Sequence, residues 1–175
     1  MLAEPLPTVL DVRKAAARGA DIRGRIRPAQ LQRFSAMLAD DQGDIQVELK
    51  FSRDEAGRYL VAVSVEAEVS VVCQRCLEPK VESLHCGSTL AMVWSDDQAK
   101  DLPRNLDPLV VTEESGNLWE LVEEELILSM GAFHYHDTDE CRELTKAYSD
   151  ADEYESSGRP NPFAELGNLK PGREQ

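Results

Sequence analysis

Residues 59–76 of this 175-residue chain, YLVAVSVEAEVSVVCQRC, predict one long strand that ends in a pair of cysteines. Apolar side chains occupy alternate positions from Tyr59 to Val71. Because successive side chains of a strand point to opposite faces, this alternation is typical of a strand with one buried face. Residues 81–94 show a similar pattern and predict a returning strand. The two strands would form a long antiparallel hairpin with Cys73-Gln74-Arg75-Cys76 at its tip.

Shorter elements are predicted on both sides of this hairpin. Apolar residues favour a strand over 45–51 and an edge strand over 22–26 that Gly24 interrupts. Residues 95–116 are expected to form a long connection with one extended piece at 109–112. At least three antiparallel strands with flanking helices predict an α+β domain, built on an antiparallel β-sheet or a partly closed β-barrel.

Three helices are predicted from the residues at their ends. Asp11 can cap a helix that ends before Gly19. A second helix is expected to begin at Pro28, because proline suits the first helical position. Asn117 can cap a third helix, which Gly131 would end. The apolar positions of the second helix, at helical spacing, are Leu31, Phe34 and Leu38.

The length of the chain predicts one domain of ordinary size followed by a tail. We expect a single α+β domain over residues 1–146. Residues 147–158 are polar, acidic and rich in small side chains, which favours a flexible linker. Residues 159–175 are expected to form a C-terminal segment with a short helix.

Two features bear on where the protein works. The longest apolar run is far shorter than the roughly 20 residues that span a bilayer, and the N-terminus lacks the pattern of a secretion signal. We therefore expect a soluble, cytoplasmic protein. Because thiols stay reduced in that compartment, the four cysteines are expected to bind metal or to be buried rather than to form disulfides.

The formal net charge of −14 is distributed unevenly along the chain. Residues 1–40 carry seven basic and four acidic side chains, whereas residues 41–157 carry nine basic and 27 acidic ones. Such an acidic body repels the phosphates of nucleic acid and attracts a basic protein, while the arginine-rich N-terminal portion could contact phosphate. Charge of this size also serves simply to keep a protein in solution.

Four side chains in two half-sites could bind one zinc ion. Cys73 and Cys76 have CxxC spacing in the hairpin tip, and His136 and Cys141 follow the third helix. Zinc takes thiolate and imidazole ligands, and four protein ligands close its coordination shell. The sequence therefore predicts a structural zinc site. His134 is an alternative to His136, and the spacing does not distinguish them.

The reactive side chains permit other interpretations. Buried cysteine behaves as a small apolar residue, and a CxxC pair can be redox-active, although no strand–CxxC–helix pattern surrounds this one. Cys86 shares the phase of apolar neighbours and is assigned to the core. The carboxylates of residues 123–125 are expected on the solvated face of an amphipathic helix. No nucleophile-elbow sequence appears, so no catalytic residue is predicted.

Two segments are candidates for contact with RNA or a protein partner. Gln74 and Arg75 lie between the two cysteines, and Arg75 is the best-placed side chain to reach a phosphate or a base, although it could equally be exposed without a partner. The second segment lies near the C-terminus, in a short helix that could dock on its own domain or in the groove of a partner. Its candidate residues are Pro160, Asn161, Pro162 and Phe163.

Six motifs, spread over nearly the whole chain, carry a family resemblance. They are VCQRC (72–76), LVEEELIL (121–128), His136-Asp137, Cys141, RPNPFAEL (159–166) and Leu169-Lys170. With these motifs the sequence resembles the YceD family, the large ribosomal RNA subunit accumulation proteins of bacteria and plastids. Residues 131–133, Gly-Ala-Phe, depart from the family pattern, which often has proline and aliphatic residues there.

The resemblance implies a non-enzymatic factor in ribosome biogenesis that is needed for normal amounts of large-subunit ribosomal RNA. It would act in the synthesis, processing or stability of that RNA. The expected partners are precursor ribosomal RNA, a basic ribosomal or processing protein, or both, with no membrane and no small-molecule substrate. Structural zinc is the one cofactor expected. A metal-dependent ribonuclease and a purely protein-binding adaptor are the alternatives.

Overall fold

The computed structural model of the protein describes residues 4–111, 115–149 and 163. The chain divides into two compact units, residues 1–136 and residues 137–175. The first unit contains a five-stranded sheet with its helices, and the second contains the helix α5 (Asp139–Ser149). Of the predicted linker (147–158), the structure describes only residues 147–149, which end α5. Of the predicted C-terminal segment (159–175), it describes only Phe163.

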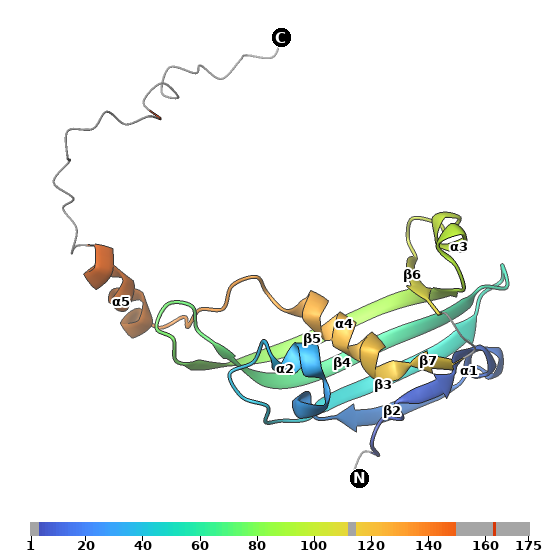
Figure 1. Ribbon diagram of the computed structural model, residues 1–175, viewed down its shortest axis with the longest axis horizontal. Coiled ribbons are helices and arrows are strands. Elements are labelled where there is room, and N and C mark those ends of the chain that lie inside the picture. Colours follow the sequence, from blue (N-terminus) through green and yellow to red (C-terminus); the bar gives the residue numbers. More distant parts are fainter. Residues whose placement is uncertain (1–3, 112–114, 150–162, 164–175) are drawn as a thin grey trace. The chain divides into compact units, whose positions relative to one another are not determined.

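The main sheet has the strand order β2-β3-β4-β5-β6 (Figure 1). Neighbours from β2 to β5 pair antiparallel, and β6 pairs parallel with β5. The predicted α+β class is confirmed, and the sheet is open rather than a partly closed barrel. The strands are β2 (Asp21–Ile26), β3 (Ile45–Arg53), β4 (Tyr59–Val72), β5 (Pro79–Val93) and β6 (Asp107–Val110).

The long hairpin predicted from the alternating sequence is confirmed. Strands β4 and β5 pair continuously from Tyr59↔Met92 to Val72↔Pro79. In β3 and β4 nearly every second side chain is buried, and these residues belong to one core cluster. Helices α2 (Gln32–Ser35) and α4 (Leu118–Ser129) lie over this face of the sheet (Figure 1). One apolar face therefore carries the core, as is usual for an antiparallel sheet with helices on one side.

A second, two-stranded sheet holds the starts of two helices together. Strand β1 (Val9–Asp11) pairs antiparallel with β7 (Ser115–Asn117), and each strand runs directly into a helix, α1 (Val12–Arg18) or α4. Both predicted caps are confirmed. Asp11 Oδ1 accepts from the Lys14 amide at 2.9 Å, and Asn117 Oδ1 accepts from the amides of Trp119 and Glu120 at 3.1 and 3.3 Å.

The helix predicted from Pro28 onward is broken at Leu31. Its first part is a 3-10 turn (η1, Pro28–Gln30), and its second part is α2. Leu31 between them is extended, with φ −107° and ψ 94°, and is 2% exposed. The break has a physical reason: Glu123 Oε1 accepts from the amides of Arg33 and Phe34 at 2.7 and 3.1 Å, which gives α2 its own N-terminal cap.

Within the predicted connection, the described segment 95–111 contains a helix as well as the extended piece expected near residues 109–112, of which residue 112 lies outside the described residues. It contains α3 (Asp96–Lys100), which Ser95 caps, and the parallel strand β6. Helix α3 has no buried residue, so it shows no apolar period in the sequence. Of the described residues, none belongs to a helix with the length and apolar character that spanning a bilayer requires.

Gly24 does not interrupt β2, because the strand pairs with β3 along its whole length. Instead the glycine allows a close approach of the N-terminal segment. Leu6 donates its amide to the Arg25 carbonyl at 3.0 Å, and a Cβ on residue 24 would lie 2.8 Å from the Leu6 backbone. We therefore expect Gly24→Ala to lower the free energy of unfolding by about 1–3 kcal/mol, since the added methyl has no space.

Chemical denaturation measures this effect, and Gly87→Ala is the matched control. Gly87 also lies inside a strand, but a Cβ there would be 3.7 Å from the nearest heavy atom, the Val63 carbonyl oxygen. Alanine at residue 87 should raise stability by about 0.5 kcal/mol, because glycine is unfavourable in a strand interior. Equal effects of the two substitutions would contradict the packing argument.

Candidate metal centre

The tip of the β4–β5 hairpin is a tight turn over residues 73–78. The Leu77 amide donates to the Cys73 carbonyl at 2.9 Å, and the Cys73 amide donates to the Glu78 carbonyl at 3.0 Å. Leu77 adopts φ 62°, a left-handed conformation that is unfavourable for a side chain with a Cβ. Because its side chain is 74% exposed, burial of leucine does not compensate for this strain. The turn brings the two cysteines of the CxxC motif to one side.

Hydrogen bonds of the backbone and of side chains fix the segment that follows α4 to this tip. The Gln74 amide donates to the His134 carbonyl at 3.0 Å, and the His136 amide donates to Cys73 Sγ at 3.5 Å. His136 Nε2 lies 3.1 Å from the Pro79 carbonyl oxygen. A carbonyl oxygen only accepts, so this contact places the proton on Nε2 and leaves the Nδ1 lone pair available. Nδ1 faces Cys76 Sγ at 3.2 Å.

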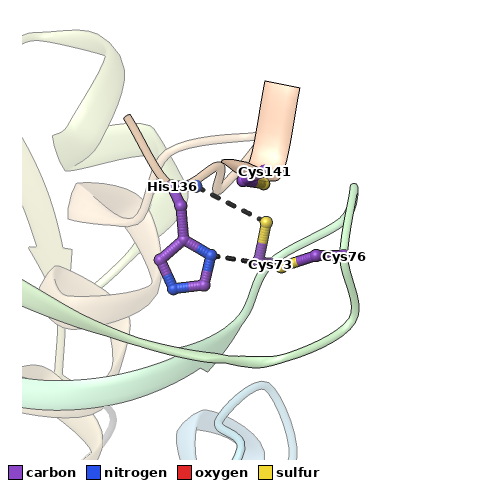
Figure 2. A group of neighbouring side chains, drawn as sticks. All are labelled: Cys73, Cys76, His136 and Cys141. Atoms are coloured by element: carbon purple, nitrogen blue, oxygen red, sulfur yellow. Dashed lines mark hydrogen bonds between the residues drawn. The ribbon is translucent and has the colours of Figure 1, made fainter. Parts of the chain in front are cut away.

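The four predicted ligands come together in one cluster (Figure 2). The ligand atoms of Cys73, Cys76, His136 and Cys141 all lie within 4.8 Å of one another. In a tetrahedral zinc site with Zn–S bonds of about 2.3 Å, neighbouring sulfur atoms are about 3.8 Å apart. A contraction of about 1 Å or less would therefore bring the donors to zinc-binding distances. Three thiols and one imidazole are a donor set typical of structural zinc.

Backbone hydrogen bonds favour a charged sulfur at this site, although the sulfur is buried. Cys73 is fully buried, and burial alone would raise the pKa of its thiol. Hydrogen bonds from the amides of Cys76, Arg75 and His136 outweigh this effect and lower the pKa to about 5. The thiolate is the form that binds metal, so the turn prepares Cys73 for that role before any ion arrives.

The structure distinguishes between the two histidines that the sequence left as alternatives. His134 is 8% exposed, and its Nδ1 lies 3.7 Å from a carboxylate oxygen of Glu82. It does not belong to the cluster, whereas His136 does. Cys86, assigned to the core, is half-buried and packs against the core cluster. Burial raises the pKa of its thiol, which keeps it protonated.

The predicted contact residues of the tip lie close to the cluster. Gln74 is exposed and Arg75 is half-buried, with its guanidinium carbon 4.8 Å from the centroid of the Tyr135 ring. Phe163 is 68% exposed. Pro160, Asn161 and Pro162 lie outside the described residues.

Two features of this region were not predicted from the sequence. Glu123 was expected on a solvated face, but it is 7% exposed and caps α2. Phe133 and Tyr135 were not singled out, although the sequence Phe-His-Tyr-His over residues 133–136 carries a signal. In an extended segment alternate residues face opposite sides, so two histidines directed at the hairpin require two aromatic rings directed away from it.

Comparison with known proteins gives the chain a family. A family model described as "Large ribosomal RNA subunit accumulation protein YceD" matches residues 61–170. A Haemophilus influenzae protein of the same description is 34% identical over 168 residues, which cover 94% of this chain and 96% of that protein. No solved structure matches. The chain belongs to the YceD family.

Proposed function

We propose that this chain is a non-enzymatic ribosome biogenesis factor of the cytoplasm. It supports the synthesis, processing or stability of large-subunit ribosomal RNA. One observation carries this proposal: the match to YceD proteins, which are described as large ribosomal RNA subunit accumulation proteins, extends over nearly the whole chain. The acidic body and the Cys/His cluster at the hairpin tip suggest how such a factor would make its contacts.

In this proposal the cluster binds one structural zinc ion through Cys73, Cys76, His136 and Cys141. Four protein ligands leave no open coordination position, which a metal-dependent ribonuclease would need for water or substrate. The ion would supply no chemistry to a reaction. It would hold the turn and the segment before His136 as one rigid body, and so keep Gln74 and Arg75 in a fixed position for RNA.

The acidic surface offers a second contact, to a basic ribosomal or processing protein. A groove of about 690 Å³ lies between α4 and the β5–β6 edge, and its lining combines apolar side chains with carboxylates. A basic protein segment with an apolar anchor matches this lining in charge and in hydrophobicity. The carboxylates are Asp107, Glu120, Glu124 and Glu125; Glu124 pairs with Arg33, which also lines the groove. Pro160, Asn161, Pro162 and Phe163 would add a partner contact from the C-terminal segment.

Binding of precursor ribosomal RNA by the purified chain tests the RNA contact. We expect Arg75→Ala to weaken binding and to reduce the slope of log K against log salt by about one, as the loss of one phosphate contact requires. Arg104→Ala is the matched control, because Arg104 is exposed in the connection before β6 and far along the chain from the tip. It should leave the slope unchanged.

The same variants, expressed in cells, test whether RNA binding by the protein determines the amount of large-subunit ribosomal RNA. Cells that lack the protein should contain less large-subunit ribosomal RNA, and the wild-type chain should restore it better than Arg75→Ala does. Chelator-sensitive cleavage of precursor RNA by the purified chain would support a ribonuclease instead. Salt-insensitive binding to a basic ribosomal protein, without crosslinks from residue 75 to RNA, would support a protein-binding adaptor.

A further inference from the structure

The segment that carries His136 presents two aromatic rings to solvent. Phe133 is 70% exposed and Tyr135 is 41% exposed. Their planes are parallel within 7°, with centroids 6.3 Å apart. The alternate residues are directed the other way: His134 is buried, and His136 contacts Pro79 and Cys76 of the hairpin. The two rings are therefore held outward by the same backbone that directs the histidines inward.

The positively charged side chain of Arg75 lies next to this aromatic pair. Its guanidinium carbon lies 4.8 Å from the centroid of Tyr135, within the range of a cation–π contact. In the described parts of the chain no carboxylate lies within salt-bridge distance of Arg75, although most of the other basic side chains there have such a partner. On this acidic protein Arg75 thus places a positive charge beside the Tyr135 ring, which in turn stacks with Phe133.

Packing against the described residues of the core explains neither ring. Phe133 and Tyr135 belong neither to the core cluster nor to the apolar side chains packed against it. The group is nevertheless well fixed, because the Gln74 amide binds the carbonyl of His134, the residue between the two rings. Exposed aromatic rings on a rigid support, next to an arginine, are the surface on which proteins stack the bases of single-stranded nucleic acid.

We propose that Phe133, Tyr135 and Arg75 form a stacking platform for unpaired RNA bases. The proposal rests on the RNA contact proposed above for the hairpin tip and specifies its ligand as single strands, loops or bulges. Bases within an A-form duplex have their faces covered by their neighbours, so the platform cannot use them. A base would stack on the exposed face of Phe133, while Arg75 contacts the adjacent phosphate or a second base.

Three fluorescently labelled oligoribonucleotides test the platform by anisotropy titration of the full chain. They are a mixed-sequence single strand of 12 nucleotides, the same strand in a duplex, and the same strand with abasic sites. We expect the wild-type chain to bind the intact single strand at least about tenfold more tightly than the other two. Phe133→Ala should weaken single-strand binding about tenfold and leave duplex binding unchanged, since one stacked base is lost.

Conservative variants separate stacking from a general apolar contact. Phe133→Trp keeps an aromatic plane and should bind the single strand at least as well as the wild type. Phe133→Leu keeps an apolar side chain without that plane, and should bind like Phe133→Ala. Val9→Ala, which removes a 57%-exposed side chain from β1, is the surface control and should bind like the wild type. Circular dichroism of each variant shows whether the fold is intact.

The possible results distinguish the platform from the broader function. If the wild-type chain binds precursor RNA but Phe133→Ala binds the single strand equally well, the platform is wrong and the RNA contact stands. If no RNA of any form binds, the RNA contact fails and the platform fails with it. If Phe133→Ala loses binding to a basic protein while its RNA binding is unchanged, the exposed rings serve a protein interface instead.

Discussion

Cys73→Ser is expected to abolish zinc binding while leaving the five-stranded sheet folded. Cys73 is the most deeply buried ligand of the cluster, and its sulfur accepts a hydrogen bond from the His136 amide. Serine offers a weaker donor, and its hydroxyl is not ionised at neutral pH, so the metal content should fall from about one zinc ion per chain to near zero. The core cluster does not include Cys73, so the secondary structure should remain.

Metal analysis, circular dichroism and hydrogen exchange measure this effect. The amides of Cys73 and Leu77, which are hydrogen-bonded within the turn, should exchange faster in the variant and in chelator-treated wild type. Cys86→Ser is the matched control, since Cys86 is a half-buried cysteine outside the cluster, and it should keep its zinc. Wild-type protein purified without any zinc, with a rigid turn, would contradict the structural role.

Glu123→Ala is expected to lower the free energy of unfolding by about 2–4 kcal/mol, because two backbone donors lose a charged acceptor. Those donors are the amides of Arg33 and Phe34, and Phe34 is fully buried. Water cannot readily replace the carboxylate there, so the donors remain unsatisfied in the variant. The start of α2 should then separate from α4, and the protein should unfold at a lower denaturant concentration.

Two neighbouring variants isolate the cause of this loss. Glu123→Gln keeps a neutral acceptor and should cost only about 1 kcal/mol. Glu124→Ala removes an exposed carboxylate that pairs with the Arg33 guanidinium, and should cost less than about 1 kcal/mol. If Glu123→Ala and Glu124→Ala were equally destabilising, the buried cap would not be the reason. Denaturant titrations of the three variants under one condition provide the comparison.

The elements that could be predicted from the sequence are those with a long, regular apolar pattern or a capping residue. Strand β4 has such a pattern over its whole length, and Asp11 and Asn117 act as the caps that their side chains suggest. The four-residue cluster was also predicted, because the CxxC pair and the later histidine and cysteine together offer the ligands that zinc takes. For the hairpin and the caps the information is local in the sequence, whereas the two halves of the cluster lie about 60 residues apart.

The parts that could not be predicted depend on contacts between distant residues. The predicted helix is broken at Leu31 because Glu123, about 90 positions away, caps the start of α2. The residues around Leu31 give no sign of this contact. The choice of His136 over His134 depends on carbonyls of Pro79 and of His134 itself, which only the folded hairpin brings into position. Helix α3 buries no side chain, so it leaves no apolar period.

The distance along the chain between the hairpin tip and His136 has a consequence for folding kinetics. Strands β2 to β5 pair with their neighbours in sequence, whereas Cys76 and His136 are 60 residues apart. Closing a long loop costs more chain entropy than zipping adjacent strands, so contacts between neighbours form earlier. The sheet should thus assemble first, and the ligands should meet only after α4 has docked. If the cluster binds zinc as proposed, the ion would then meet a nearly complete protein, and metal capture would be the last step of maturation.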